Sequence, residues 1–228
     1  MPENYDDLVL KATRVREFVP LAQIDIMDGK FVASKSWPYR EAGVPSEPHF
    51  MSMVAQEEEL PFFDELDYEI DLMIAEPERH IDEWLPLGAS RLIFHIEAIK
   101  DHELFWAHDI WKEGARDIGG QKVVEIGLAI TPGTPLESVL PYGDRVDFIQ
   151  CMGISRIGYQ GQPFDERVLD MVNTIRNTYP NLPISIDGGV NMDTAADLVA
   201  AGASRLVAGS AIFGAEDIEA AVRALEAC

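Results

Sequence analysis

Residues 184–190 combine a short apolar run with an acid and two glycines, a set of residue types that could transfer a proton. The alternating isoleucines indicate a buried strand, and Asp187 stands at its carboxyl end. Gly188 and Gly189 follow, and they permit a sharp turn that presents bare backbone N–H groups. We expect a helix to begin after Asn191 as its N-cap, so that its positive end faces an anion. The pattern fits proton transfer on a phosphorylated substrate, and it fits an ordinary strand-to-helix turn equally well.

Apolar runs with polar or glycine residues at their carboxyl ends recur along the chain. We expect strands at residues 21–27, 68–74, 91–99, 123–130, 146–154, 184–190 and 205–208. We expect helical segments at residues 5–19, 77–87, 103–115, 136–140, from Pro163 onward, 192–201 and 217–225. Polar or glycine residues at the strand ends include Asp25, Asp71, His95, Thr131, Ser155, Asp187 and Gly209. The alternation predicts a parallel sheet covered by helices, and side-chain chemistry at every strand end favours a (β/α) barrel over an open, doubly wound sheet.

The composition favours one globular domain over residues 1–228 and argues against several classes of protein. The chain is 47% hydrophobic but has no run of about 18 apolar residues, so we expect neither a membrane span nor a membrane partner. Its formal net charge of -22 argues against nucleic-acid binding. The acidic first residues lack a secretory pattern, and two cysteines do not make a disulfide scaffold, so we expect a cytoplasmic protein. A surface this acidic would suit a high-salt cytoplasm, although solubility alone also explains it.

Seven segments of the chain, taken together, resemble the ribulose-phosphate 3-epimerase family in order and spacing. They are residues 25–32 (DIMDGKFV), 71–73 (DLM), 95–97 (HIE), 130–135 (ITPGTP), 152–164, 186–189 (IDGG) and 209–213 (GSAIF). The resemblance implies a TIM barrel that inverts C3 of a pentulose 5-phosphate by means of two aspartates and a divalent metal.

This resemblance identifies Asp25 and Asp187 as the two acid/base residues of the reaction and also as metal ligands. Inverting a carbon beside a carbonyl requires a base on one face of the substrate and an acid on the other. The two aspartates are far apart in the sequence, and closure of a barrel would place them on opposite sides of a bound sugar. For Asp25 taken alone, an aspartate that fixes a strand-end turn is the alternative interpretation.

The resemblance also implies which residues line the substrate site. Methionines would lie beside the metal and the reacting carbons, and the backbone amides of glycine-containing loops would bind the phosphate. These residues are Met27, Met73, Met152, Gly158, Gly161, Gly188, Gly189, Gly209 and Ser210. Core packing is the more common role of a methionine. For His95 we favour the role of a hydrogen-bonded polar residue at a strand end.

The chain departs from the family pattern where two histidines complete the metal site. Those two positions hold Gln23 and Asp71, so the implied metal ligands are Gln23, Asp25, Asp71 and Asp187. A set of oxygen ligands favours magnesium or manganese over zinc. Three carboxylates would also leave the site negative, which disfavours both a developing enediolate and the approach of a sugar phosphate.

Two further departures concern the loop after the fifth strand and the start of the chain. The loop, residues 155–162, is one residue longer than the family's and lacks its proline, and Arg156 is either a cation for the phosphate or a surface charge. The family's first strand has no counterpart, because the residues before Gln23 read as a helix. Seven strands do not easily close a barrel that usually has eight, and the gap would leave an unpaired seam between strand edges. Three explanations are open: the true start lies upstream, the barrel is distorted, or a second subunit covers the seam. We favour a homo-oligomer in which the first helix or a partner covers it.

These features support two hypotheses of different classes. The first is a sugar-phosphate epimerase that inverts C3 of a ketose phosphate through an enediolate, with an optional Mg, Mn or Zn ion. The second is a truncated, non-catalytic barrel that only binds phosphate ligands. The two retained aspartates favour the first hypothesis, and the altered metal ligands favour the second. A related decarboxylase or aldolase is disfavoured because no lysine lies at a strand end after the first strand.

Overall fold

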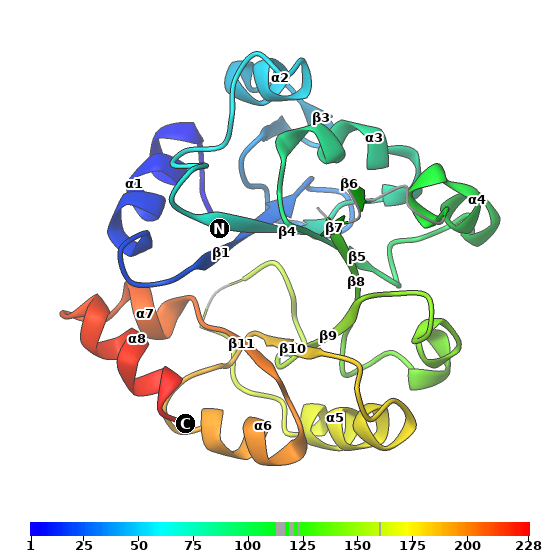
Figure 1. The fold of residues 1–228 in the computed structure, drawn as a ribbon, viewed down its shortest axis with the longest axis vertical. Helices are drawn as coiled ribbons and strands as arrows, with labels where there is room; N and C mark the ends of the chain where they lie inside the picture. Colours follow the sequence, from blue (N-terminus) through cyan, green and yellow to red (C-terminus); the bar gives the residue numbers. More distant parts are fainter. Residues whose placement is uncertain (113–116, 119–120, 123, 160) are drawn as a thin grey trace. The chain divides into compact units, whose positions relative to one another are not determined.

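Seven parallel strands form the main sheet of the computed structural model, which describes residues 1–112, 117–118, 121–122, 124–159 and 161–228. The strands are β1 (Leu21–Met27), β4 (Asp67–Met73), β5 (Arg91–His95), β8 (Glu125–Ile130), β9 (Phe148–Met152), β10 (Ile184–Asp187) and β11 (Arg205–Val207) (Figure 1). All seven predicted strands are present, but β5 ends at His95 rather than at residue 99 and β10 ends at Asp187 rather than at residue 190. The predicted start of the fourth strand at Val123 lies outside the described residues. The chain forms two compact units, Met1–Ile126 and Gly127–Cys228. A single domain over residues 1–228 stays a prediction.

In the first unit, β1, β4 and β5 pair in parallel, and their register determines which residues meet at the carboxyl ends. Asp25 lies opposite Asp71, and Met27 lies opposite Met73. The last six residues of β4 are all buried, so both faces of this strand are covered, as is usual for a parallel strand flanked by helices. The register therefore brings two acidic residues side by side, one of them deep inside the unit.

The helices of the first unit lie around its strands in Figure 1. They are α1 (Tyr5–Val15), α2 (Pro48–Val54), α3 (Ile81–Trp84) and α4 (His102–Ala107). The helix α1 begins where the side chain of Asn4 accepts a hydrogen bond from the Asp7 N–H. Its apolar side packs inward through Leu8, Ala12 and Val15, which are all buried.

Three helices predicted for the first unit are shorter than expected. The helix predicted over residues 5–19 is α1, which ends at Val15. The predicted helix over residues 77–87 is three pieces, namely η1 (Pro77–Arg79), α3 and η2 (Leu85–Leu87). Pro86 has no N–H with which to continue α3, and this ends the helix. The helix predicted over residues 103–115 is α4 followed by η3 (Asp109–Trp111), and its predicted end at Ala115 lies outside the described residues. Two short antiparallel pairs complete the unit: β2 (Tyr39–Glu41) with β3 (Val44–Pro45), and β6 (Asp117–Ile118) with β7 (Gln121–Lys122).

In the second unit, β8 to β11 pair in parallel and helices follow the last three strands. The helical elements are η4 (Leu136–Ser138), η5 (Leu140–Tyr142), α5 (Arg167–Thr178), α6 (Ala195–Ala201), α7 (Ser210–Phe213) and α8 (Ile218–Glu226). The prediction of a helix from Pro163 is wrong, because α5 begins at Arg167, after the Asp165 N–H has bonded to the Gly153 carbonyl. Asn191 is not the N-cap of α6 either, because its side chain accepts from the N–H groups of Asp193 and Thr194 and closes a turn first.

Across the residues that the structure describes, no helix combines the length and the apolar character needed to cross a membrane.

Candidate active site

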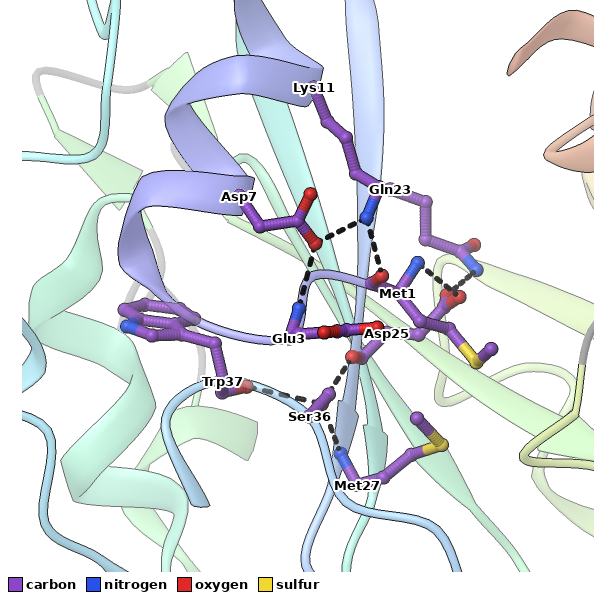
Figure 2. Close-up of polar contacts among 9 residues, drawn as sticks. All are labelled: Met1, Glu3, Asp7, Lys11, Gln23, Asp25, Met27, Ser36 and Trp37. Atoms are coloured by element: carbon purple, nitrogen blue, oxygen red, sulfur yellow. Dashed lines mark hydrogen bonds and ion pairs between the residues drawn. The ribbon is translucent and has the colours of Figure 1, made fainter. Parts of the chain in front are cut away.

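Asp25 lies on β1 at the centre of a group of polar contacts in the first unit (Figure 2). The Gln23 side chain donates from Nε2 to Asp25 Oδ1 over 2.7 Å. The amino group of Met1 lies 3.5 Å from Asp25 Oδ2, and the Asp25 side chain keeps 20% of its surface exposed. The carboxylate is therefore oriented by neighbouring donors and still reaches the surface of its unit. Gln23 faces Asp25 directly, as neighbours two residues apart on one strand face do.

Asp71, the strand neighbour of Asp25, is fully buried and pairs with a histidine that is equally buried. His95 Nε2 donates to Asp71 Oδ1 over 3.1 Å, and His95 Nδ1 lies 3.8 Å from Glu97 Oε2. Burial by itself would lower the pKa of His95, but the charge of Asp71 and the hydrogen bonds to Asp71 and Glu97 raise it to about 10. Burial raises the pKa of Asp71, and the charge and hydrogen bond of His95 oppose that rise. A positive charge on His95 thus stabilises the Asp71 carboxylate and offsets the acidic character of this strand end. The residue types alone did not identify this pairing.

Asp28 ties the turn after β1 to the segment after β4. This carboxylate is buried, with 3% of the residue exposed. Its Oδ1 accepts from the N–H groups of Lys30 and Phe31, and its Oδ2 accepts from the Ala75 N–H over 2.9 Å. The sequence pattern does not reveal this link, because the contact with Ala75 crosses 47 positions of the chain.

The three methionines predicted to line the site are the last residues of their strands. Met27 ends β1, Met73 ends β4 and Met152 ends β9. They are 2%, 3% and 2% exposed, respectively. Each therefore presents an apolar side chain at the carboxyl end of its strand, where it can exclude water from a reacting carbon.

Asp187 ends β10 in the second unit and lies opposite Met152 of β9. Its backbone carbonyl accepts from the Gly153 N–H over 2.7 Å, which joins the ends of the two strands. Gly188 and Gly189 follow with φ values of +91° and +70°, in the left-handed region that favours glycine. The turn after Asp187 therefore depends on glycine.

The other predicted phosphate-binding residues lie in two loops of the second unit. Gly158 and Gly161 have φ values of +83° and +68° in the segment after β9. Gly209 precedes the short helix α7, of which Ser210 is the first residue. Arg156 packs its guanidinium over the ring of Tyr159, 4.3 Å from the ring centre, on the exposed part of the same segment. These backbone conformations offer N–H groups of the kind that bind anions.

Side-chain oxygens are the candidate metal ligands. Asp25 and Asp71 are strand neighbours in the first unit, and Asp187 stands at a strand end in the second. Gln23 directs its amide nitrogen, rather than its oxygen, toward Asp25. Carboxylate oxygens fit a hard divalent ion such as magnesium or manganese. The donor chemistry therefore fits a divalent metal held chiefly by aspartates.

Comparisons with known proteins show a similarity to one family. The sequence model of the ribulose-phosphate 3 epimerase family matches residues 6–213. The chain is 33% identical over 204 residues to the ribulose-phosphate 3-epimerase of Schizosaccharomyces pombe. The aligned segment covers 89% of this chain and 78% of that protein. It is 34% identical over 206 residues to the Mycobacterium leprae ribulose-phosphate 3-epimerase, covering 89% of this chain and 80% of that one.

A solved structure supports the predicted fold class. The 3-hexulose-6-phosphate synthase from Salmonella typhimurium is similar with a TM-score of 0.64 at 14% identity, over 100% of this chain and 94% of that chain. This likeness concerns the fold alone. Together with the seven parallel strands and their flanking helices, it confirms the predicted (β/α) barrel class.

Proposed function

The chain belongs to the ribulose-phosphate 3-epimerase family, and on this premise we propose that it inverts C3 of a ketose phosphate with Asp25 and Asp187 as acid and base. The observation that carries the proposal is the position of the two aspartates. Asp187 is the last residue of β10 and Asp25 lies two residues before the end of β1, so both lie toward the carboxyl ends of parallel strands, where (β/α) barrels hold their catalytic residues. The alternative of a non-catalytic barrel is not favoured, because both aspartates remain where the family motif has them.

The reaction needs only two proton transfers. One aspartate removes the proton from C3 of D-ribulose 5-phosphate, and the electron pair of the broken C–H bond forms an enediolate with the C2 carbonyl. The other aspartate delivers a proton to the opposite face of C3, which yields D-xylulose 5-phosphate. Met27, Met73 and Met152 exclude water from the reacting carbons, and the glycine-containing loops bind the phosphate through backbone N–H groups.

A divalent metal held by Asp25, Asp71 and Asp187 completes the proposal. When bound, such an ion neutralises charge that develops on the enediolate oxygens. Gln23 is also a predicted ligand, and its hydrogen bond to Asp25 suits it to orient that carboxylate. His95 lies 3.1 Å from Asp71, and its positive charge reduces the net negative charge that three carboxylates give the site.

The test is proton NMR of D-ribulose 5-phosphate in deuterated water with the purified protein. We expect the C3 proton signal to disappear while xylulose 5-phosphate accumulates. In Asp187→Asn and in Asp25→Asn, which keep the side-chain size but lose the base, we expect the rate to fall by at least about a hundredfold with the fold intact. A folded wild-type chain that exchanges no C3 proton with any metal would contradict the proposal.

The metal is tested in the same assay after dialysis against a chelator. Activity should be lost on chelation and return with Mg²⁺ or Mn²⁺ in preference to Zn²⁺, because the candidate ligands are oxygens. Asp71→Asn should weaken the apparent affinity for the metal. Full activity after complete removal of divalent ions would contradict the metal part of the proposal and leave the two aspartates as its core.

A further inference from the structure

Ser36 lies outside β1 and contacts one edge of this strand beside Asp25. Residues two apart on a strand direct their backbone N–H and C=O groups to the same side, so Asp25 and Met27 present theirs to the same edge. The strand order begins with β1, and β4 is its neighbour in that order. In the first unit, the segment after the β1 turn returns to this edge and brings Ser36 into contact with it (Figure 2).

Three hydrogen bonds join Ser36 to the backbone of residues 25–27. Ser36 Oγ donates to the Asp25 carbonyl over 2.7 Å and accepts from the Met27 N–H over 2.9 Å. The Ser36 N–H donates to the Met27 carbonyl over 3.1 Å. The hydroxyl also lies 3.1 Å from the Trp37 carbonyl, the longer of its two contacts with carbonyl oxygens. Ser36 is 2% exposed, so water cannot readily replace these bonds.

Neighbouring contacts hold Ser36 itself in place. Lys35 forms an isolated antiparallel bridge with Asp28, and the Trp37 N–H donates to the Pro2 carbonyl over 2.9 Å. The Trp37 ring is buried and donates from Nε1 to Glu47 Oε2 over 3.0 Å. Ser36 therefore lies between two residues that are held by their own contacts. Its hydroxyl is fixed in position, and it binds the backbone at the end of β1.

We propose that Ser36 is a positioning residue for the epimerisation, holding the backbone on which the Asp25 carboxylate and the Met27 side chain stand. The inference rests on the proposed function of Asp25. Without the hydroxyl, the Asp25 carbonyl and the Met27 N–H lose a buried partner, and this segment relaxes toward other partners. A displacement of about 1 Å at a reacting group reduces a rate by about a hundredfold. Ser36 touches no reacting atom and acts through the two residues it holds.

The experiment compares Ser36→Ala with Ser36→Thr, which keeps the hydroxyl, and with Ser34→Ala, which removes a hydroxyl two residues away. In the C3 exchange assay, we expect Ser36→Ala to lower kcat by about ten- to a hundredfold while KM changes by less than about twofold. Ser36→Thr should recover most of the loss, and Ser34→Ala should match the wild type. Hydrogen exchange at the Met27 amide should become faster only in Ser36→Ala.

Two results would overturn the inference. One is a folded Ser36→Ala variant whose kcat stays within about twofold of an active wild type. The other is a loss of kcat that is fully explained by a smaller folded fraction, with the Met27 amide as protected as in the wild type. Failure of the proposed function is a separate result, because it would appear in the wild-type chain as the absence of any C3 exchange.

Discussion

The buried pair of Asp71 and His95 shows how this chain tolerates an acid deep in the first unit. Both side chains have no exposed surface, and their hydrogen bond is 3.1 Å long. A charge in such a place needs a partner, because burial removes its hydration. The departure at Asp71 from the family pattern is therefore matched by a neighbour on β5, and the two residues form a single electrostatic unit.

Removing only one member of this pair should be more harmful than removing both. We expect His95→Leu to lower the free energy of unfolding by about 3–5 kcal/mol, because Asp71 would remain buried without its cation. The double variant Asp71→Leu/His95→Leu should be more stable than His95→Leu, since it leaves no buried charge. Urea unfolding of the wild type, both single variants and the double variant measures the coupling. Strictly additive losses would show that the two residues do not act together.

The same pair gives the stability a defined dependence on pH. The pKa of His95 is raised to about 10 in the folded chain, against about 6.5 for an unperturbed histidine. A raised pKa means that the stability contributed by His95 is fully present below about pH 6.5 and is lost as the pH rises toward 10. The stability difference between the wild type and the double variant, which lacks both groups, should fall over this range. A difference that stays constant would argue against a charged His95.

Which residues stand at strand ends could be predicted from the sequence, but their partners could not. Asp25 and Asp187 follow apolar runs, and this pattern is visible in the sequence alone. The bond from His95 to Asp71 joins residues 24 positions apart, and the bond from Ser36 to Asp25 joins residues 11 positions apart. Both depend on strand register and on the path of a loop, which the sequence pattern leaves undetermined.

At the scale of elements, the junction between β9 and β10 is packed so closely that it requires glycine. A Cβ atom added to Gly153 would lie 2.1 Å from the Gly188 carbonyl oxygen, a backbone atom that moves only with the Asp187 turn. We expect Gly153→Ala to lower the free energy of unfolding by about 1–3 kcal/mol, as overpacking does, and to reduce C3 exchange by shifting Asp187.

Gly133→Ala is the matched control for this prediction, because a Cβ atom at Gly133 would meet nothing within 4 Å. Urea unfolding and the exchange assay on both variants separate the effect of the close contact from the general effect of adding a methyl group. Equal behaviour of Gly153→Ala and Gly133→Ala would show that the β9–β10 junction has room to adjust.

Strands were easier to predict than helix boundaries, for a physical reason. Five strands, β4, β5, β8, β9 and β10, are buried along almost their whole length, and even the partly exposed β1 and β11 are mostly apolar, so the apolar residues indicate each strand directly. Helix starts depend instead on local bonds between side chains and backbone. Asn191 and Asp165 both accept such bonds from the N–H groups of residues close after them, and these bonds delay α6 and α5 beyond the predicted first residues. A proline within the predicted helix at residues 77–87 had a similar effect on its length.

At the scale of the whole molecule, charge is the dominant feature. The chain carries 40 acidic residues against 18 lysines and arginines, for a formal net charge of -22. Like charges in this excess repel one another and oppose the compact state. Cytoplasmic location and assembly into a homo-oligomer stay predictions, whereas the charge excess leads directly to a measurable effect of salt.

We expect added salt to stabilise the chain by screening this repulsion. The Debye length falls from about 10 Å at 0.1 M to about 3 Å at 1 M ionic strength, so repulsion between separated carboxylates nearly vanishes over that range. Each 1 kcal/mol gained should raise the thermal midpoint by about 2–4 °C for a chain of this size. Melting curves in KCl and in K₂SO₄ at equal ionic strength measure the effect. An equal rise of the thermal midpoint in the two salts indicates screening of charge. A larger rise in sulfate indicates instead that the salt is excluded from the protein surface. A midpoint that is unchanged or lower in KCl would show that the acidic residues are spaced too widely, or paired too well, for their repulsion to limit stability.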